Sequence, residues 1–421
     1  MARYEKYKDS GEQWLGQVPD HWEIIKGRGV FEENVETNKD LSENTVLSLS
    51  YGKIIKKRDI NEGLVPADYR GYQIVNPNYI IIRCTDLQND KVSLRTAISK
   101  YRGIITGAYL GLIVKPKYNP DFMHYYLHTW DITKEIYRHG GGLRQVLSWE
   151  DVKYLTMLIP PKDEQNAIVS YLDSACEEID KAIAQQQRMI DLLNERKQII
   201  IQNAVTKGLD PNVPMKDSGI EWIGKIPAHW ELKHLRNFLT MFSEKGHPDA
   251  TLLSVTREQG VILRSFDIEE NHNFIPDDLS GYKHVRKGDF VINKMKSWQG
   301  SYGLSDYDGI VSPAYFTCKL NGIDNKQFFS TAIRCKAYTH FFMQYSKGIR
   351  IGQWDLDPAS MKAIPFILPP KDEQQPILDH IADKTAQIVK GIASYEKNIE
   401  LLQERKRIII NDVVTGKIKV S

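Results

Sequence analysis

The chain has 421 residues, of which 41% are hydrophobic, 26% charged and 10% aromatic, and its formal net charge is +2 at pH 7. This length predicts two to four domains with sizeable cores, and the composition is that of a globular protein. Because the chain has 56 basic and 54 acidic residues, its net charge does not identify it as a nucleic-acid binder. Any such surface must be a local patch.

Membrane segments and metal or disulfide frameworks are not indicated. The longest apolar runs, at residues 79–82 and 408–410, are too short to span a bilayer. The N-terminal segment lacks the apolar region of a secretory signal. The four cysteines form no CxxC pair, which argues against a zinc site or a disulfide framework and fits a reducing compartment. We therefore expect a cytoplasmic protein. The cysteines are Cys84, Cys176, Cys318 and Cys335.

In chain order, the first notable segment is KDSGEQWLGQVPDHW at residues 8–22. It returns as KDSGIEWIGKIPAHW at residues 216–230, with nine of its fifteen positions identical. The motif IPPKDEQ at residues 159–165 likewise returns as LPPKDEQ at residues 368–374, and each copy precedes a stretch that ends in ERK and a run of isoleucines. The sequence therefore predicts an internal duplication of about half the chain.

The variable stretches between these motifs, residues 20–158 and 228–367, contain short β-rich runs and a few helical pieces. We expect each to form a mixed α/β domain. The two stretches are only distantly similar: GIITGAYLGL in the first corresponds to GIVSPAYFTC in the second. The same architecture should therefore present two different surfaces.

The stretches after PPKDEQ predict two long helices. Their apolar residues recur in steps of three and four, and the proline pair pre-sets the first turn of each helix. A helix over residues 162–207 would be roughly 70 Å long, too long for one small domain to bury. We expect the two copies to pack on each other as a coiled coil. The alternative is two unrelated amphipathic helices, each packed on its own domain. The predicted seam is Ile168, Leu172, Ile179, Ile183 and Leu193 with Ile377, Ile381, Ile388, Ile392 and Leu402.

The position of the repeated N-terminal motif also predicts where the chain ends lie. Its second copy follows the first long helix, so by symmetry its first copy should lie just beyond the second. We expect residues 1–8 near residues 417–421, which makes the organisation nearly circular with a pseudo-twofold axis. The tryptophans of the motif should anchor each domain to the helix ends. These are Trp14, Trp22, Trp222 and Trp230.

The paired [IL]PPKDEQ motifs, the paired SG–W–G–[VI]P–HW segments and the two unlike domains between them resemble the specificity subunit of type I restriction–modification enzymes, over essentially the whole chain. The resemblance implies target-recognition domains at residues 1–158 and 211–367, each reading one half of a split double-stranded DNA target. Residues 159–210 and 368–421 would form an antiparallel coiled coil as a spacer.

The resemblance also implies partners. Two modification subunits would use S-adenosylmethionine to methylate adenine, and two restriction subunits would use ATP and Mg²⁺ to translocate and cut DNA. The chain itself would carry no chemistry and no cofactor.

The motifs agree with a non-catalytic role. The nearest approach to an [ND]PP[YF] methyltransferase motif is NPNY at residues 76–79, which we interpret as a turn. No GxxxxGK[ST] phosphate loop occurs. The eleven histidines show no paired-ligand spacing, so we expect surface or core histidines and no metal site. A self-sufficient methyltransferase or nuclease is therefore disfavoured. A coiled-coil adaptor without DNA binding of its own remains an alternative.

The candidate DNA contacts are basic and amide residues beside glycine turns and in basic runs, since phosphates take Lys and Arg and base edges also take amides. The alternative for each is an ordinary surface charge or a turn ion pair. In the first domain they are Lys53, Lys56, Lys57, Arg58, Arg83, Arg95, Arg102, Arg144 and Gln145. In the second they are Arg257, Arg264, Lys294, Lys296, Arg350 and Gln353.

The first long helix has a different charge balance. Residues 162–197 carry eight acidic and five basic side chains, which makes a poor phosphate surface and suits protein docking. Its ERK cluster, and the equivalent one at residues 404–406, could form helix-end ion pairs or subunit contacts.

Overall fold

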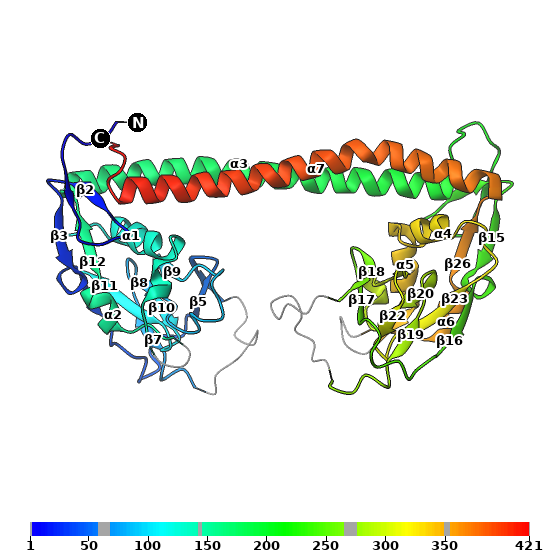
Figure 1. The fold of residues 1–421 in the computed structure, drawn as a ribbon, viewed down its shortest axis with the longest axis horizontal. Helices are drawn as coiled ribbons and strands as arrows, with labels where there is room; N and C mark the ends of the chain where they lie inside the picture. The colour runs from blue at the N-terminus through cyan, green and yellow to red at the C-terminus, as the bar shows by residue number, and fades with distance from the viewer. Residues whose placement is uncertain (1, 58–67, 142–144, 265–275, 349–353, 421) are drawn as a thin grey trace. The chain divides into compact units, whose positions relative to one another are not determined.

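The computed structural model describes residues 2–57, 68–141, 145–264, 276–348 and 354–420 (Figure 1). The chain divides into two compact units. Unit 1 comprises residues 1–187 and 397–421, and unit 2 comprises residues 188–396. Each unit contains one variable stretch and a part of both long helices. The predicted mixed α/β class is confirmed.

Unit 1 is built on a four-stranded antiparallel sheet in the order β4-β11-β8-β9, accompanied by the pairs β1-β2, β3-β12, β5-β6 and β7-β10. Helix α1 packs against β9. The elements are β1 Tyr7–Asp9, β2 Gln17–Pro19, β3 Glu23–Lys26, η1 Gly27–Gly29, β4 Phe31–Glu33, β5 Leu47–Ser50, β6 Lys53–Lys56, β7 Gln73–Val75, β8 Ile80–Ile82, β9 Thr96–Ile98, β10 Gly103–Ile105, β11 Leu110–Val114, α1 Pro120–Ile132, η2 Glu135–Arg138, α2 Trp149–Tyr154, β12 Thr156–Ile159 and the start of α3 Lys162–Lys207.

Unit 2 repeats this topology: its sheet has the order β16-β23-β20-β21, with the pairs β13-β14, β15-β26, β17-β18 and β19-β22. Two helices, α4 and α5, stand where unit 1 has α1. The elements are β13 Met215–Asp217, β14 Lys225–Pro227, β15 Glu231–His234, η3 Leu235–Asn237, β16 Leu239–Phe242, β17 Leu253–Thr256, β18 Gly260–Leu263, β19 Lys283–Val285, β20 Asp289–Ile292, η4 Ser297–Gln299, β21 Tyr302–Leu304, β22 Gly309–Val311, β23 Phe316–Leu320, α4 Lys326–Ile333, α5 Lys336–Tyr345, β24 Ser346–Lys347, β25 Asp355–Leu356, α6 Pro358–Ala363, β26 Pro365–Leu368 and α7 Lys371–Val414.

A shared close approach of two backbones explains why one glycine survives in both diverged copies. A Cβ on Gly103 would lie 2.5 Å from the Thr45 carbonyl oxygen, and a Cβ on Gly309 would lie 2.4 Å from that of Thr251. Only glycine allows such an approach. The next residue then donates its N–H to the same carbonyl, at 2.8 Å in both units.

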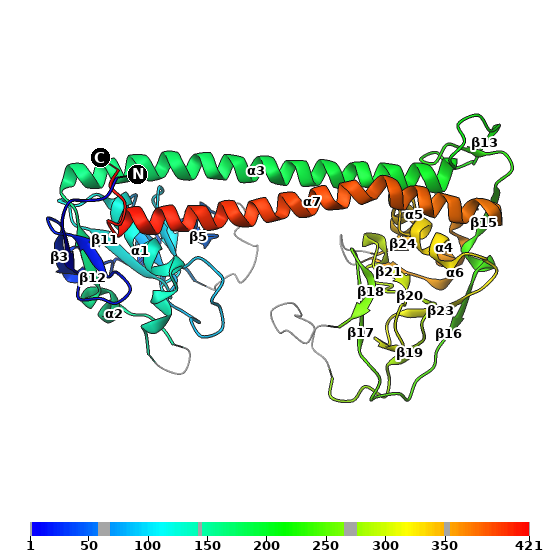
Figure 2. The ribbon, with the colours of Figure 1, turned by 45° about the horizontal axis from the view of Figure 1, so that its top comes forward.

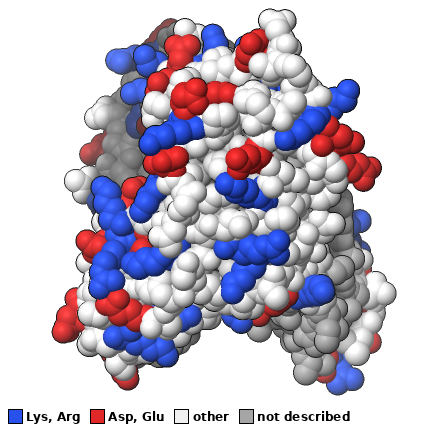
Figure 3. Space-filling view, turned by 90° about the vertical axis from the view of Figure 1, so that its right-hand side faces the viewer, with Lys and Arg blue, Asp and Glu red and all other residues white. Residues whose placement is uncertain are grey.

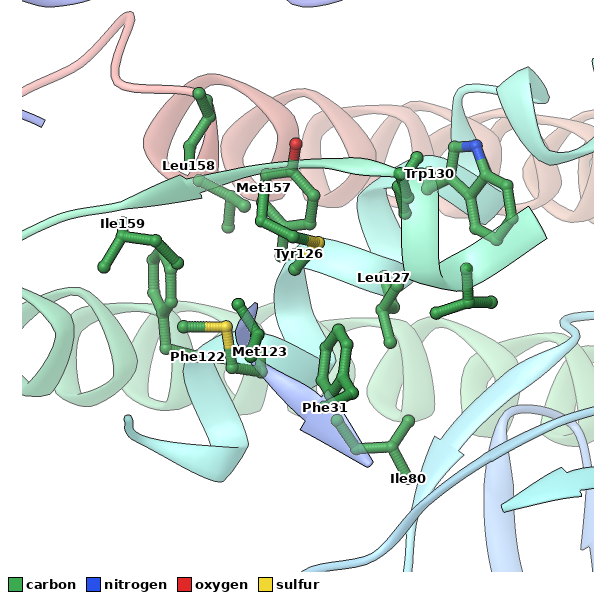
Figure 4. Close-up of a cluster of buried hydrophobic side chains, with 14 of the residues drawn as sticks. Phe31, Ile80, Phe122, Met123, Tyr126, Leu127, Trp130, Met157, Leu158 and Ile159 are labelled. Atoms are coloured by element: carbon green, nitrogen blue, oxygen red, sulfur yellow. The ribbon is translucent and has the colours of Figure 1, made fainter. Parts of the chain in front are cut away.

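The core of unit 1 lies between its sheet, α1 and β12. Figure 4 shows side chains from β4, β8, α1 and β12 converging in one cluster. Tyr126 is fully buried, and its hydroxyl donates to the Thr156 carbonyl at 2.6 Å. The labelled members of the cluster are Phe31, Ile80, Phe122, Met123, Tyr126, Leu127, Trp130, Met157, Leu158 and Ile159.

The core of unit 2 is rich in aromatic rings. Phe329 packs on Phe290 with ring centroids 5.4 Å apart and on Phe366 at 4.9 Å, while Phe238 lies 5.3 Å from Phe366. Edge and tilted arrangements of this kind add about 0.5–1.5 kcal/mol per pair to the burial of the rings. The aromatic residues therefore hold the end of η3, β20, α4 and β26 together.

The two long helices, α3 and α7, lie side by side within each unit (Figures 1 and 2). In unit 1, Lys406 of α7 bonds both carboxylate oxygens of Asp180 of α3, at 2.7 and 2.8 Å. In unit 2, Leu193 of α3 contacts Gly391 of α7. The start of one helix thus lies along the end of the other. Among the predicted seam residues, Ile168, Leu172, Ile179, Ile377, Ile381 and Ile388 are buried, while Ile183, Leu193, Ile392 and Leu402 are half-buried.

The glutamine of each PPKDEQ motif ties a long helix to the neighbouring globular part. Gln165 donates to the Pro160 carbonyl at 2.8 Å and accepts the backbone N–H of Asn119, the residue that caps α1, at 2.9 Å. Gln374 makes the same pair of bonds to Pro369 and Asn325. Both glutamines are 2% exposed, so the motif is a buried joint.

The His-Trp pair of the repeated N-terminal motif lies where the two helices meet. In unit 1, His21 bonds Glu164 of α3 at 2.9 Å, and Trp22 lies 3.1 Å from the Cβ position of Gly416. In unit 2, His229 bonds Glu373 of α7, and Trp230 lies 3.1 Å from that of Gly208. Both tryptophans are fully buried, as anchors of the helix ends should be.

The two ends of the described chain are neighbours in unit 1. Lys419 donates its backbone N–H to the Ala2 carbonyl at 2.9 Å. The position of the repeat predicted this proximity. Over the described residues, no helix combines the length and apolar character that a membrane span requires.

Candidate nucleic-acid interface

In unit 1 the first basic run forms one side of an exposed hairpin. Strands β5 and β6 are joined by Tyr51 and Gly52, which both have positive φ, 47° and 73°. This two-residue turn projects Tyr51, 94% exposed, into solvent. The hairpin carries Lys53, Lys56 and Lys57, all exposed.

The hairpin meets a second candidate segment. The Lys56 ammonium lies 4.8 Å from the centroid of the Tyr101 ring, and Arg102 follows directly in the chain. The Arg102 guanidinium bonds Asn76 Oδ1 at 2.6 Å and approaches Glu43 at 3.4 Å. The structure thus gathers Lys56, an exposed ring and Arg102 on one surface. This is a combination that can hold a phosphate and stack on a base.

Arg95 is a correction to the sequence prediction. Its side chain is fully buried, and its guanidinium donates to the carbonyls of Arg83, Thr85, Asp86 and Asp90. A buried guanidinium with its donors occupied cannot reach a phosphate. Arg95 therefore stabilises the loop between β8 and β9.

Two further candidates in unit 1 are held by internal contacts. Arg83 is half-buried and pairs with Asp90 at 3.2 Å. The Gln145 amide donates to the carbonyls of Tyr137 at 2.6 Å and His139 at 2.9 Å. Their DNA role remains a prediction, and DNA contact by Gln145 would require those bonds to break. Arg58, Arg144, Arg350 and Gln353 lie outside the described residues.

In unit 2 the equivalent hairpin, β17-β18, has a longer connection that presents Arg257. Arg334 of the α4–α5 corner donates to the carbonyls of Arg257 and Glu258, both at 2.8 Å, and to that of Tyr302. Burial lowers the pKa of Arg334, and nearby Tyr302 and Glu258 oppose this shift. Arg334 is not among the sequence candidates, because nothing in its local sequence shows which loop it clamps.

This hairpin borders a cleft of about 700 Å³ in unit 2. The cleft has a predominantly basic lining with two acidic exceptions, Glu258 and Asp306. Lys197 of α3, the last residue of the ERK cluster, is among the residues that line it. The basic lining residues are Lys197, Arg257, Lys287, Lys326, Arg334 and Lys336.

The remaining candidates of unit 2 lie around an aromatic pair. Trp298 and Trp354 have ring centroids 5.1 Å apart. Lys294 is half-buried and paired with Asp355 at 2.8 Å, whereas Lys296 is exposed. Arg264 is half-buried and directly follows β18. Lys296 is therefore the candidate of this group that is best placed to meet a ligand.

Charge is mixed on the face shown in Figure 3, where basic and acidic side chains are interleaved. This agrees with the small net charge of +2.

Residues 76–79 form a turn between β7 and β8, closed by the Tyr79 N–H on the Asn76 carbonyl at 3.2 Å. The interpretation of NPNY as a turn is confirmed.

We compared the chain with protein families, curated proteins and solved structures. No family model matches the sequence. The chain is 23% identical over its whole length to the type I restriction enzyme MjaVIII specificity subunit of Methanocaldococcus jannaschii, of which it covers 98%. It is 22% identical, again over its whole length, to a protein of that organism provisionally named the type I restriction enzyme MjaX specificity subunit, of which it covers 99%.

A solved structure has the same fold. The chain matches, with a TM-score of 0.63 and 11% identity, a chain from a study of complex assembly and conformational transition of a type I restriction–modification system. The match covers 95% of this chain and 99% of that one. The resemblance that the paired motifs indicate is confirmed by these relatives.

Proposed function

We propose that this chain is the DNA-recognition subunit of a type I restriction–modification complex, in which each unit reads one half of a bipartite double-stranded target. One observation carries the proposal. The two units have the same strand order, yet their equivalent hairpins present different groups: Tyr51 and lysines in unit 1, Arg257 and a basic cleft in unit 2. One frame with two unlike surfaces suits the reading of two unlike half-sites.

The long helices act as spacer and docking surface in this proposal. We infer that α3 and α7 form one antiparallel coiled coil, with the units related by a pseudo-twofold axis in a circular arrangement. The antiparallel contacts within each unit and the adjacent chain ends support this. Two equivalent faces would then receive two modification subunits, and two restriction subunits would join them.

The chemistry belongs to the partners in this proposal. The modification subunits would bring S-adenosylmethionine for adenine methylation, and the restriction subunits would bring ATP and Mg²⁺. The lack of a phosphate loop and of a methyltransferase motif in the sequence supports this division.

Domain exchange tests the two-reader proposal. Residues 20–158 are replaced by the equivalent segment of a relative with a known target, and the chain is expressed with its modification partner. Single-molecule mapping of methylated adenines should show one half-site changed and the other retained. The reciprocal exchange of residues 228–367 is the matched control and should change the opposite half. An unchanged target in both would support the alternative, an adaptor without DNA recognition of its own.

Insertion of whole helical turns tests the spacer. Additional turns within residues 165–205, matched by equal insertions in α7, should lengthen the gap between the two methylated half-sites while leaving both half-sites intact. A gap that stays constant while methylation persists would contradict the spacer role.

A further inference from the structure

Three potential metal ligands meet on unit 2. Glu244 lies just after β16, His247 follows in the same loop, and His284 is the central residue of β19. The ligand atoms of the three side chains all lie within 4.8 Å of one another. The backbone N–H of His284 donates to the backbone carbonyl of Glu244 at 2.7 Å. This bond fixes the positions of two of the three residues relative to each other.

The distances fit a tetrahedral ion. Glu244 Oε1 lies 3.1 Å from His247 Nε2 and 3.5 Å from His284 Nδ1. Two ligands about 2.1 Å from a tetrahedral zinc ion are roughly 3.4 Å apart. Both imidazole nitrogens therefore stand at about the separation from one carboxylate oxygen that an ion between them would require. The two rings are stacked, with centroids 4.4 Å apart.

One of these nitrogens lacks a hydrogen bond. His284 Nδ1 is buried and has no hydrogen-bond partner among the described residues. A buried, unbonded nitrogen of this kind costs free energy unless something satisfies it. Glu244 Oε1 approaches this nitrogen at 3.5 Å without forming a hydrogen bond, and a metal ion between the two atoms would satisfy the nitrogen.

The carboxylate is held ready as an anion. Arg286 donates to both oxygens of Glu244 at 2.8 Å. Such a partner orients a ligating carboxylate, and without an ion Oε1 also shares a hydrogen bond with His247 Nε2 at 3.1 Å.

Among the described residues, the cluster occurs in unit 2 and has no equivalent in unit 1. The backbone bond from His284 to Glu244 has its counterpart in unit 1 between Ile74 and Glu36, at 3.0 Å. Three residues after Glu36 the chain has Lys39, where unit 2 has His247. One carboxylate is thus shared by the two copies, and the two imidazoles are not. The three-residue cluster is therefore not part of the architecture that the two units share.

We propose that Glu244, His247 and His284 bind a divalent transition-metal ion, with Zn²⁺ as the preferred ion and water at the fourth position. The ion would join the loop after β16 to β19 in unit 2. Two imidazoles and one carboxylate are a ligand set that zinc accepts, and hard ions such as Mg²⁺ prefer oxygen ligands. The proposal does not depend on the DNA-recognition function.

The test is zinc binding by the full-length chain, purified without a histidine tag and stripped with a chelator. Competition with a chromophoric zinc indicator should show one tight site per chain, and Co²⁺ in its place should give the visible absorption of a four-coordinate ion. His247→Ala is the main variant because His247 is exposed, so its loss should leave the fold intact. Zinc affinity should fall more than tenfold, and zinc should no longer raise the melting temperature.

The matched control is His229→Ala. His229 also pairs with a glutamate of unit 2, Glu373, but no third ligand is found there among the described residues. This variant should bind zinc as the unchanged chain does. Glu244→Gln should weaken zinc binding as His247→Ala does. Absence of a tight site in the unchanged chain, or equal affinity in the His247→Ala variant, would overturn the proposal.

Discussion

The indole Nε1 of Trp230 donates to Glu373 Oε2 at 3.0 Å, joining the repeated N-terminal motif to the first turn of α7. In the other copy, Glu164 accepts bonds from His21 and Tyr4 instead. Trp22 Nε1 is buried and has no hydrogen-bond partner among the described residues. The repeat therefore uses the same residues at two joints with different bonding.

This difference predicts unequal costs for the same substitution. Trp230→Phe removes a bond to a charged group and leaves Glu373 with one partner fewer, whereas Trp22→Phe removes an unpaired N–H. Because both rings are fully buried, the packing losses should be similar. Trp230→Phe should cost about 1.5–3 kcal/mol more in free energy of unfolding, measured with denaturant. Equal costs would show that the Trp230 bond contributes nothing.

The close approach at Gly309 predicts a second stability effect. An alanine Cβ would lie 2.4 Å from the Thr251 carbonyl oxygen, so one of the two backbones must move. Gly309→Ala should destabilise unit 2 by about 1–3 kcal/mol or more. Gly281→Ala is the matched control, because a Cβ there meets no atom within 4 Å. A melting temperature that is the same in both variants would contradict the tight contact.

Two histidines of α1 predict acid sensitivity. Burial, with a smaller effect of the Lys100 charge, lowers the pKa of His124 to about 4. Burial, with smaller effects of the His124 and Lys406 charges, lowers the pKa of His128 to about 3. An unfolded histidine titrates near 6.5, so the unfolded state takes up protons first. The stability of unit 1 should therefore be complete above about pH 6.5 and fall as the pH drops towards 4.

The measurement is the urea midpoint at pH 7.5 and pH 5. His124→Gln should reduce the drop between the two pH values, because that side chain no longer takes up a proton on unfolding. His380→Gln, at a half-buried histidine of α7 in unit 2, should leave the drop unchanged. An unaltered drop in the His124→Gln variant would argue against this histidine as the source.

The DNA surface of unit 1 predicts a salt-dependent effect. Lys56→Ala should weaken binding about equally for all sequences and reduce the salt slope by about one, as expected when one phosphate contact is lost. Binding is measured with the chain assembled with its modification subunits. Lys181→Ala removes an exposed lysine of α3 that pairs with Glu177 and should leave the slope unchanged. If the two variants behave alike, Lys56 does not contact DNA.

Arg95 gives a contrasting prediction. Because its guanidinium holds four carbonyl groups inside unit 1, Arg95→Ala should lower the stability of unit 1 by several kcal/mol. The variant molecules that remain folded should bind DNA with an unchanged dependence of affinity on salt concentration. If the salt dependence of DNA binding changed while the free energy of unfolding did not, Arg95 would have to contact DNA after all.

The sequence by itself determined the duplication, the long helices and the class of each variable stretch. Helix α3 begins and ends at Lys162 and Lys207 as expected, because proline pairs and three-four periodicity are local signals. The repeated motif likewise predicted that the chain ends meet.

Tertiary structure alone decided the roles of individual polar side chains. Arg95 looked like a surface arginine and is buried, whereas Arg334 gave no local signal and clamps the Arg257 loop. Glu244 and His284 come from elements far apart in the chain and meet through one backbone bond. A charged or imidazole group takes its role from its burial and its neighbours, and these depend on which strands pair, which no local pattern specifies.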